Sequence, residues 1–340
     1  MTTNPRAAAD ILQEGNAMEL LKTRDKALEL LRANRNEWEP RYSKYASDIE
    51  KNQENLKSKR KQFREWDPLK IYLPLGKVMS QKSKVSFDVR FLGQSVANLI
   101  VDDGSGQILI NTSEKQVVSN KDCFGYCDPL DMVLWDSKKA QEFRAFFKKT
   151  PQKNNVGNEE HRLESLLLTE FSKKSAKEEK KALVGIQPVR FAGIDGIRIP
   201  MKTPLRASIN LDYSAEDGGG IDILTRVRGS IGVVELKREK TPAIAVACQS
   251  VAYAVFIREL MRSESGQIWW NLLGFDGKLP NPLELYAVHA MPSDKNNDYS
   301  LAGRIIDFED GSEKDSIVLH YLYFTEANNE ITNIDSSLSK

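Results

Sequence analysis

Residues 218–253, GGGIDILTRVRGSIGVVELKREKTPAIAVACQSVAY, form the stretch around which the rest of the chain is organised. Two runs rich in β-branched residues, 221–227 and 231–237, flank the sequence Arg228-Gly229-Ser230. Such runs on either side of a glycine predict a β-hairpin with a tight turn. The apolar stretch that follows, residues 243–262, predicts a long helix.

Charged side chains stand at the open end of this hairpin. Because side chains alternate between the two faces of a strand, Glu235 and Lys237 project from the same face. Asp222, thirteen residues before Glu235, lies nearly opposite it if the turn is centred on Gly229. Two carboxylates and an ammonium group then share one patch of sheet. Carboxylates hold hard divalent cations, and a lysine beside them can orient a water or stabilise phosphate charge.

The Glu-x-Lys pattern has little value by itself, because it also occurs at residues 178–180 and 179–181. A surface ion pair on a strand is the simplest interpretation of the bare pattern. Only the copy at residues 235–237 ends an apolar β run and has an aspartate, Asp222, across the expected hairpin. That context favours a functional role for this copy.

These residues, followed by Gln249-Ser-Val-Ala-Tyr253 on the next helix, resemble the PD-(D/E)XK nuclease superfamily, especially its RecB-like and resolvase-like members with a Gln-x-x-x-Tyr motif. The resemblance covers about residues 158–325. It implies an α/β (α+β) restriction-endonuclease-like core with a mixed central sheet flanked by helices. It also implies a metal-dependent endodeoxyribonuclease, a phosphodiester hydrolase that uses Mg²⁺, with Mn²⁺ as a substitute. Isoleucine rather than proline before Asp222 is a departure at a position that varies in the superfamily.

The resemblance assigns roles to the residues of the motif. Asp222 and Glu235 would bind the metal together with the main-chain carbonyl of Leu236, and Lys237 would position or activate the attacking water.

Two residues of the following helix, Gln249 and Tyr253, lie one turn apart and would face the site to contact substrate or metal-bound water. A purely structural role remains open for each of them. Gln249 can hydrogen-bond a neighbouring main-chain group, and Tyr253 can serve as a packing residue.

A third acidic residue is expected on the helix that begins near residue 158. Its apolar face is formed by Leu163 and Leu167, with Leu166 beside them. Glu164 is preferred as the additional metal ligand because these leucines place it beside the buried seam. Glu160, one turn earlier on the same face, is the alternative.

Residues 1–65 predict a helical hairpin or coiled-coil region, with a break at Glu39-Pro40. Apolar residues recur there at helical spacing, in stripes longer than a monomeric hairpin needs. We therefore expect a homo-oligomer, a dimer or higher, held partly through these helices.

Two basic segments are candidates for contacts with a nucleic-acid backbone, namely Lys57, Lys59, Arg60, Lys61, Arg64 in the first and Lys173, Lys174 in the second. Each segment is explained more simply as a solvated helix face or loop, and a partner contact is a further possibility for the first.

Residues 66–150 predict a small β-rich or α+β domain with a recognition or regulatory role. Short strands are expected at 84–92, 96–102 and 107–111, and an amphipathic helix at 138–149. A nuclease domain at 158–327 follows, and the tail at 328–340 is expected to be flexible.

The composition of the chain limits the classes of protein to which it can belong. The 49 basic and 48 acidic residues give a net charge of +1, which neither supports nor excludes a nucleic-acid partner. Three cysteines form no disulfide framework, and Cys123 and Cys127 lack the further ligands of a zinc site. The start of the chain has no secretion signal, and residues 243–257 are too short to span a bilayer. We expect a cytoplasmic protein without a membrane segment.

The biological setting is open at this point. Nucleases with appended domains resemble restriction enzymes and prokaryotic antiviral defence effectors such as the Shedu type. A DNA repair or recombination nuclease is an alternative, as is a nucleic-acid-binding protein that retains the fold without cleavage. The presence of Asp222, Glu235 and Lys237 together argues against a non-cleaving protein.

Overall fold

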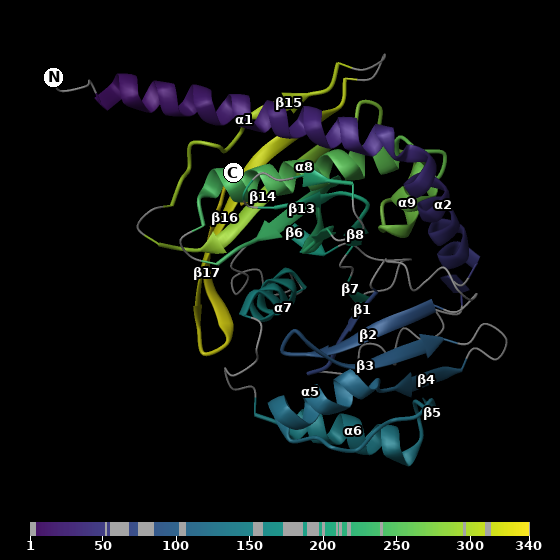
Figure 1. The fold of residues 1–340 in the computed structure, drawn as a ribbon. Coiled ribbons are helices and arrows are strands. Elements are labelled where there is room, and N and C mark those ends of the chain that lie inside the picture. The colour runs from purple at the N-terminus through teal and green to yellow at the C-terminus, as the bar shows by residue number, and fades with distance from the viewer. Residues whose placement is uncertain are drawn as a thin grey trace.

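The computed structural model describes residues 5–51, 53–54, 68–73, 85–101, 107–151, 159–172, 186–188, 197–198, 201–208, 210, 213–215, 219–238, 241–294, 297–309 and 314–339. Two sheets lie one above the other, and helix α7 (Glu159–Phe171) lies between them (Figure 1). The chain is thus a mixed α/β protein, as expected.

The larger sheet has seven strands in the order β15-β16-β14-β13-β12-β6, with β17 paired to β16. Its strands are β6 (Ile186–Pro188), β12 (Ile223–Val227), β13 (Ser230–Leu236), β14 (Glu284–Pro292), β15 (Ile305–Asp307), β16 (Ser316–Ala327) and β17 (Glu330–Ser336). The three central strands β13, β14 and β16 are parallel, and the outer pairings are antiparallel. The predicted mixed central sheet is therefore confirmed.

Helices cover both faces of this sheet. The alternation along β13 directs Ile231 and Val233 into the core shared with α8 (Ala243–Met261), and directs Val234 and Leu236 into the core shared with α7. Helix α9 (Gly266–Leu272) follows α8 and packs beside it. Strand β13 is therefore buried on both faces, which explains its almost continuous apolar sequence.

The predicted hairpin is present, with a turn one residue shorter than expected. Arg228 and Gly229 alone form the turn, with φ angles of 50° and 92°, and Val227 pairs with Ser230. Positive φ at both central residues suits the right-handed twist of a two-residue hairpin. The pairing continues the register that places Asp222, just before β12, opposite Glu235.

Two short pairs of antiparallel strands precede Asp222. Strand β8 (Met201–Thr203) pairs with β11 (Gly219–Ile221), and β9 (Arg206–Ala207) pairs with β10 (Tyr213–Ser214). A Cβ on Gly219 would lie 2.0 Å from the Leu205 carbonyl oxygen, so this close approach requires glycine.

The smaller sheet has six strands in the order β5-β4-β3-β2-β1-β7. They are β1 (Lys70–Tyr72), β2 (Val85–Phe91), β3 (Gln94–Val101), β4 (Ile108–Asn111), β5 (Val133–Leu134) and β7 (Ile197–Arg198), and they pack with α5 (Glu114–Phe124) and α6 (Lys138–Lys149). The aromatic rings of Phe91, Phe124 and Phe147 meet in its core. Strand β7 pairs in parallel with β1, so a segment from the second half of the chain completes the small domain.

The N-terminal helices belong to the core of the larger half. Helix α1 (Pro5–Ala33) lies along α8, and α2 (Arg35–Lys51) contacts α9 (Figure 1). Two consecutive helices occupy the region predicted as a helical hairpin or coiled coil, and the buried side chains of both pack into the core that contains α8. The apolar stripes are thus used within the chain, and the homo-oligomer stays a prediction.

The break between these helices differs from the prediction. It lies at Asn34, whose carbonyl oxygen accepts hydrogen bonds from the N–H groups of Glu37 and Trp38 at the start of α2. The Asn34 side chain donates to the Leu30 carbonyl at the end of α1, at 3.0 Å. Pro40 lies inside α2 instead of interrupting it.

The expected flexible tail is wrong as well. Asn328 and Asn329 have positive φ angles of 54° and 61° and turn the chain back, so that β17 pairs with β16. Ile331 and Ile334 of β17 pack into the core beside α7. The short helix η4 (Ser337–Ser339) then ends the described part of the chain.

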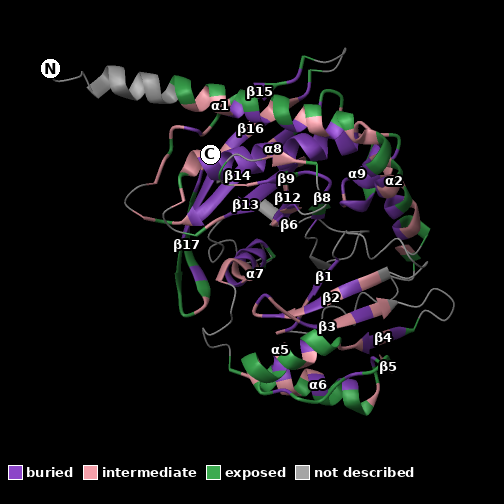
Figure 2. Ribbon diagram, in the orientation of Figure 1, coloured by how far each residue is buried: buried purple, intermediate pink, exposed green. Residues whose placement is uncertain are grey.

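Helix α8 is long and apolar enough, by length and composition, to span a membrane, yet 94% of its most apolar window is buried within the fold. Figure 2 shows α8 in the interior beneath α1. Its position is that of a core helix.

Candidate active site

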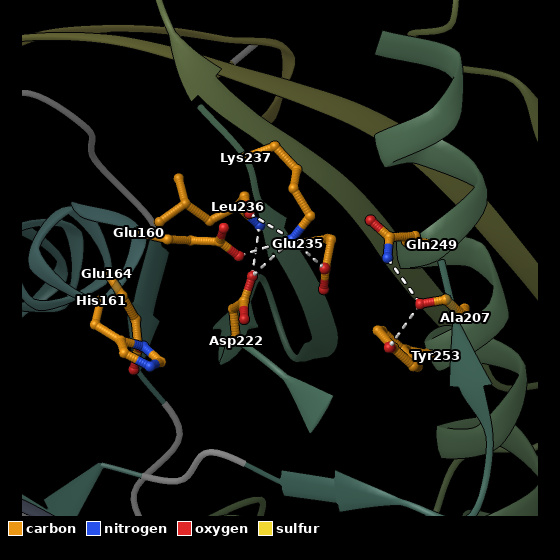
Figure 3. A network of polar contacts seen from close by, with 10 residues as sticks. All are labelled: Glu160, His161, Glu164, Ala207, Asp222, Glu235, Leu236, Lys237, Gln249 and Tyr253. Carbon is orange, nitrogen blue, oxygen red and sulfur yellow. Dashed lines mark hydrogen bonds and ion pairs between the residues drawn. The ribbon is translucent and has the colours of Figure 1, made fainter. Parts of the chain in front are cut away.

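The charged residues of the hairpin converge at its open end (Figure 3). The Asp222 Oδ2 atom accepts a hydrogen bond from the Leu236 N–H at 2.9 Å, which fixes the carboxylate against the end of β13. Glu235 is almost completely buried, with 3% of its side chain exposed. The side chains of Asp222 and Lys237 are only 22% and 16% exposed.

The Lys237 ammonium group is the centre of this cluster. Its Nζ donates to Glu235 Oε1 at 2.8 Å and to Glu160 Oε1 at 2.8 Å. It also donates to the Leu236 carbonyl oxygen at 2.9 Å and lies 4.0 Å from Asp222 Oδ2. The ammonium group therefore contacts the same oxygens that the resemblance assigns to a metal ion.

Burial and neighbouring charges change the pKa values of the two carboxylates, Asp222 and Glu235. Burial raises the pKa of Asp222 well above its ordinary value, and the charge of Glu235 raises it further. Burial also raises the pKa of Glu235, against the opposing effect of Lys237. Burial alone would lower the pKa of Lys237, but the charges of Glu235 and Asp222 outweigh it, so the net pKa is raised. Additional positive charge in the cluster would stabilise both carboxylates in their ionised form.

Helix α7 brings two glutamates to the cluster, and they have different partners. Glu160 contacts Lys237 directly, as described above. Glu164 is buried one turn later, where its Oε2 atom lies 3.3 Å from His161 Nδ1 and 3.8 Å from Arg90 Nη1. The charge of Glu164 is close enough to contribute to the raised pKa of Asp222. The glutamate in contact with the Glu-x-Lys motif is therefore Glu160, the alternative of the two, while Glu164 faces the small domain as well.

Gln249 and Tyr253 both point from α8 toward one carbonyl group. Gln249 Nε2 donates to the Ala207 carbonyl oxygen at 2.8 Å, and the Tyr253 hydroxyl donates to it at 3.4 Å. Burial and the charge of Glu235 raise the pKa of the Tyr253 phenol, which places this hydroxyl within electrostatic reach of the acidic cluster. The main-chain contact that the structural interpretation expected for Gln249 is present, and it uses only the amide nitrogen.

Three buried oxygens of this region are left without a partner. Glu235 Oε2, Glu164 Oε1 and Gln249 Oε1 accept no hydrogen bond from any residue that the structure describes. A buried acceptor without a partner costs roughly 1–3 kcal/mol, so three together need an explanation. A bound ion or a water held in the site would supply the missing contacts.

The donor set available to a metal ion is small. Within the described ranges, no group of three or more His, Cys, Asp or Glu side chains is placed to hold one. Two carboxylates, Asp222 and Glu235, and the Leu236 carbonyl remain as donors, all of them oxygens. Mg²⁺ is commonly held by one or two carboxylates and retained waters, so this oxygen set fits it. The unpartnered Glu235 Oε2 is the atom that most directly supports the fit.

The basic residues proposed for nucleic-acid contact, at positions 57–64 and 173–174, lie outside the described residues. His161 and Arg90 were not among the predicted site residues. No local pattern marks them, because Arg90 belongs to the small sheet and reaches the site only through the fold.

No protein-family model matches the chain, no curated protein matches it, and no solved structure matches it. The case for a function therefore rests on the residues and contacts of the site itself.

Proposed function

We propose that this chain is a Mg²⁺-dependent nuclease that hydrolyses DNA phosphodiester bonds at the open end of the β12–β13 hairpin. The observation that carries the proposal is the convergence of Asp222, Glu235 and Lys237 on one spot, where the buried Oε2 atom of Glu235 has no hydrogen-bond partner among the described residues. A surface ion pair on a strand, the simpler interpretation of the Glu-x-Lys pattern, would not need the second carboxylate and would not bury the Glu235 side chain.

In this proposal each residue of the site has a separate role. Asp222, Glu235 and the Leu236 carbonyl would hold Mg²⁺, which when bound lowers the pKa of a water and offsets charge on a phosphate oxygen. Lys237 would stay positively charged beside these ligands and orient the attacking water or the phosphate. Glu160 holds the Lys237 ammonium group in place through its 2.8 Å contact.

Helix α8 adds two polar groups. Gln249 Oε1 is an open acceptor for a water or a substrate hydroxyl, because the amide nitrogen alone is used by Ala207. The Tyr253 phenol keeps its proton at neutral pH, since its pKa is raised, and so it can act as a hydrogen-bond donor.

DNA as substrate and a role in restriction or antiviral defence are the parts of the proposal that rest on the PD-(D/E)XK resemblance. The proposed cytoplasmic location rests on the composition of the chain. A repair or recombination nuclease would use the same residues in the same way. Both settings predict cleavage that depends on Asp222.

The test is a cleavage panel with the purified full-length chain on plasmid, linear and single-stranded DNA and on RNA. We expect cleavage with Mg²⁺ or Mn²⁺, binding without cleavage in Ca²⁺, and no cleavage in EDTA. Asp222→Asn should remove the activity, whereas the matched change Asp276→Asn, at an exposed loop residue, should not.

Robust cleavage in EDTA would rule out the proposed site. An enzyme that needs an activating signal would not cut in this panel, but calorimetric titration of the same protein with Mn²⁺ would still detect its metal site. A chain that neither cuts any substrate nor binds Mn²⁺ would be a binding protein that retains the fold.

A further inference from the structure

The small domain reaches the candidate site through Arg90 on β2. Its guanidinium group stacks over the Tyr72 ring, with the Cζ atom 4.3 Å from the ring centroid, and its Nε donates to Asp88 Oδ2 at 2.7 Å. Its Nη1 atom then lies 3.8 Å from Glu164 Oε2. A partly buried cation from one sheet therefore lies close to a buried carboxylate on the helix that packs against the other sheet.

Arg90 is itself held by a chain of polar contacts that begins at α5. Gln116 Nε2 donates to Ser95 Oγ at 2.8 Å, and the Ser95 hydroxyl donates to Asp88 Oδ1. Asp88 in turn holds Arg90 through its other oxygen. Burial alone would lower the pKa of Arg90, but the charges of Asp88 and Glu164 help to raise it, so the guanidinium stays charged.

The backbone also fixes the distance between β2 and α7. Gly93 follows β2 in a tight turn with a φ angle of 81°, and a Cβ there would lie 2.5 Å from the His161 carbonyl oxygen. The turn therefore rests on the first turns of α7. Tyr72, under the Arg90 guanidinium, packs into the same core as Leu163 of α7.

Glu164 is consequently held on one side only. Its Oε2 atom faces Arg90 and His161, while its buried Oε1 atom accepts no hydrogen bond within the described part of the chain. Glu164 lies outside the donor set of Asp222, Glu235 and the Leu236 carbonyl, but its charge reaches Asp222. Its open oxygen would therefore act on a bound cation through a water that the cation retains, and the partners of its other oxygen set its position.

We propose that Arg90 is a positioning residue for Glu164, through which the small domain sets the affinity of the candidate site for a divalent cation. This inference rests on the proposed function. It assigns the small domain a structural role in the site, in addition to any recognition role.

The test compares Mn²⁺ binding, by calorimetry, for the full-length parent chain and for Arg90→Ala, Arg90→Lys and Arg144→Ala. Arg144 is the matched control, because its Cζ atom also lies over an aromatic ring of the small domain, 3.8 Å from the Trp135 centroid. Arg144 belongs to α6, and this helix lies on the side of the small sheet away from α7 (Figure 1). We expect Arg90→Ala to weaken Mn²⁺ binding by about tenfold, Arg90→Lys to weaken it less, and Arg144→Ala to leave it unchanged.

A second comparison shows whether Arg90 acts through Glu164. In a Glu164→Gln background, Arg90→Ala should weaken Mn²⁺ binding by less than about twofold, because the group it positions has lost its charge. Cleavage by Arg90→Ala should also recover toward the parent rate at saturating Mn²⁺, which a damaged fold would not do. Thermal unfolding of each variant identifies any that fails to fold, and Arg90→Lys then carries the comparison.

The outcomes separate the two proposals. A parent chain that binds no Mn²⁺ overturns the proposed function and this inference with it. A parent chain that binds Mn²⁺ no better than Arg90→Ala overturns only the role of Arg90. If Arg90→Ala weakens Mn²⁺ binding equally in the parent and in the Glu164→Gln background, Arg90 does not act through Glu164.

Discussion

In the proposed site, Lys237 would compete with a metal ion for the same atoms. Its Nζ is hydrogen-bonded to Glu235 Oε1 and to the Leu236 carbonyl, both of which belong to the proposed donor set. Binding of a cation would therefore move the ammonium group away from at least one of these oxygens. The freed positive charge would then be available to a phosphate or to the attacking water, which is where a nuclease needs it.

Lys237→Ala should separate cation binding from chemistry. Two unit charges about 4 Å apart interact by roughly 1 kcal/mol in water, and the double charge of Mn²⁺ makes this roughly 2 kcal/mol, so Mn²⁺ should bind about thirtyfold more tightly. Cleavage should fall by orders of magnitude, because the charge that acts on the water or phosphate is gone. Asp222→Ala should instead lose both the metal and the activity.

Parallel calorimetry and cleavage time courses on both variants provide the measurement. If folded Lys237→Ala cuts at the parent rate, Glu235-Leu236-Lys237 is an ordinary strand end and the nuclease proposal loses its main support.

At the scale of elements, Asp315 ties the end of α8 to the sheet. This fully buried carboxylate accepts hydrogen bonds from Arg258 Nε at 2.8 Å and Arg262 Nε at 2.9 Å, and from the Leu283 N–H at 2.8 Å. Burial would raise the pKa of Asp315, but the hydrogen bonds from the two arginines and the Leu283 N–H outweigh it, so the pKa is lowered. Because α8 carries Gln249 and Tyr253, this anchor also holds one wall of the candidate site.

Asp315→Ala should strongly destabilise the fold. Removing one partner of a buried ion pair costs roughly 3–5 kcal/mol, because the remaining charges stay buried without compensation. The matched change Glu142→Ala, in an exposed pair with Lys138, should cost under about 1 kcal/mol. Urea unfolding at pH 7 measures both free energies of unfolding, and equal values for the two variants would contradict the role given to Asp315.

The difference in unfolding free energy between the parent chain and Asp315→Ala depends on pH. The folded-state pKa of Asp315 lies below its ordinary value of 3.8, so its contribution to stability is complete above that pH. The contribution is lost as the pH falls through the lowered pKa. The unfolding free energies of the parent chain and of Asp315→Ala should therefore become more similar in acid.

For the molecule as a whole, the N-terminal helices are part of the half that contains the larger sheet and are not an appendage. Trp38 of α2 is 2% exposed, and its indole N–H donates to the Leu31 carbonyl at 2.8 Å. Its ring makes an edge contact with Phe256 of α8, with the centroids 5.8 Å apart. Helices α1 and α2 thus cover the outer side of α8 and should unfold together with it.

Trp38→Ala should lower the unfolding free energy by roughly 3–5 kcal/mol, as expected for truncating a fully buried aromatic residue. Unfolding should remain a single transition when it is followed both by far-UV circular dichroism and by tryptophan fluorescence. Met18→Ala, at a position that is 57% exposed, is the control and should change stability little. A separate early transition that involves only the N-terminal helices would show that they fold independently.

The hairpin, its register and the long helix after it were predictable from the sequence, because alternation, turn residues and apolar runs are local signals. The same locality explains why Asp222, Glu235 and Lys237 could be placed together from the sequence. The Asn328-Asn329 turn is also a local signal, and recognising it would have predicted β17.

The tertiary structure alone decided which elements and side chains meet. An apolar stripe shows that one face of α1 is buried, but not that α8 covers it, because many apolar surfaces could do so. Glu160 and Glu164 share a helix face, and only the reach of Lys237 distinguishes them. Arg90 approaches Glu164 from another sheet, and a contact between residues so distant in sequence leaves no pattern in the chain, because it depends on how the two sheets pack around α7.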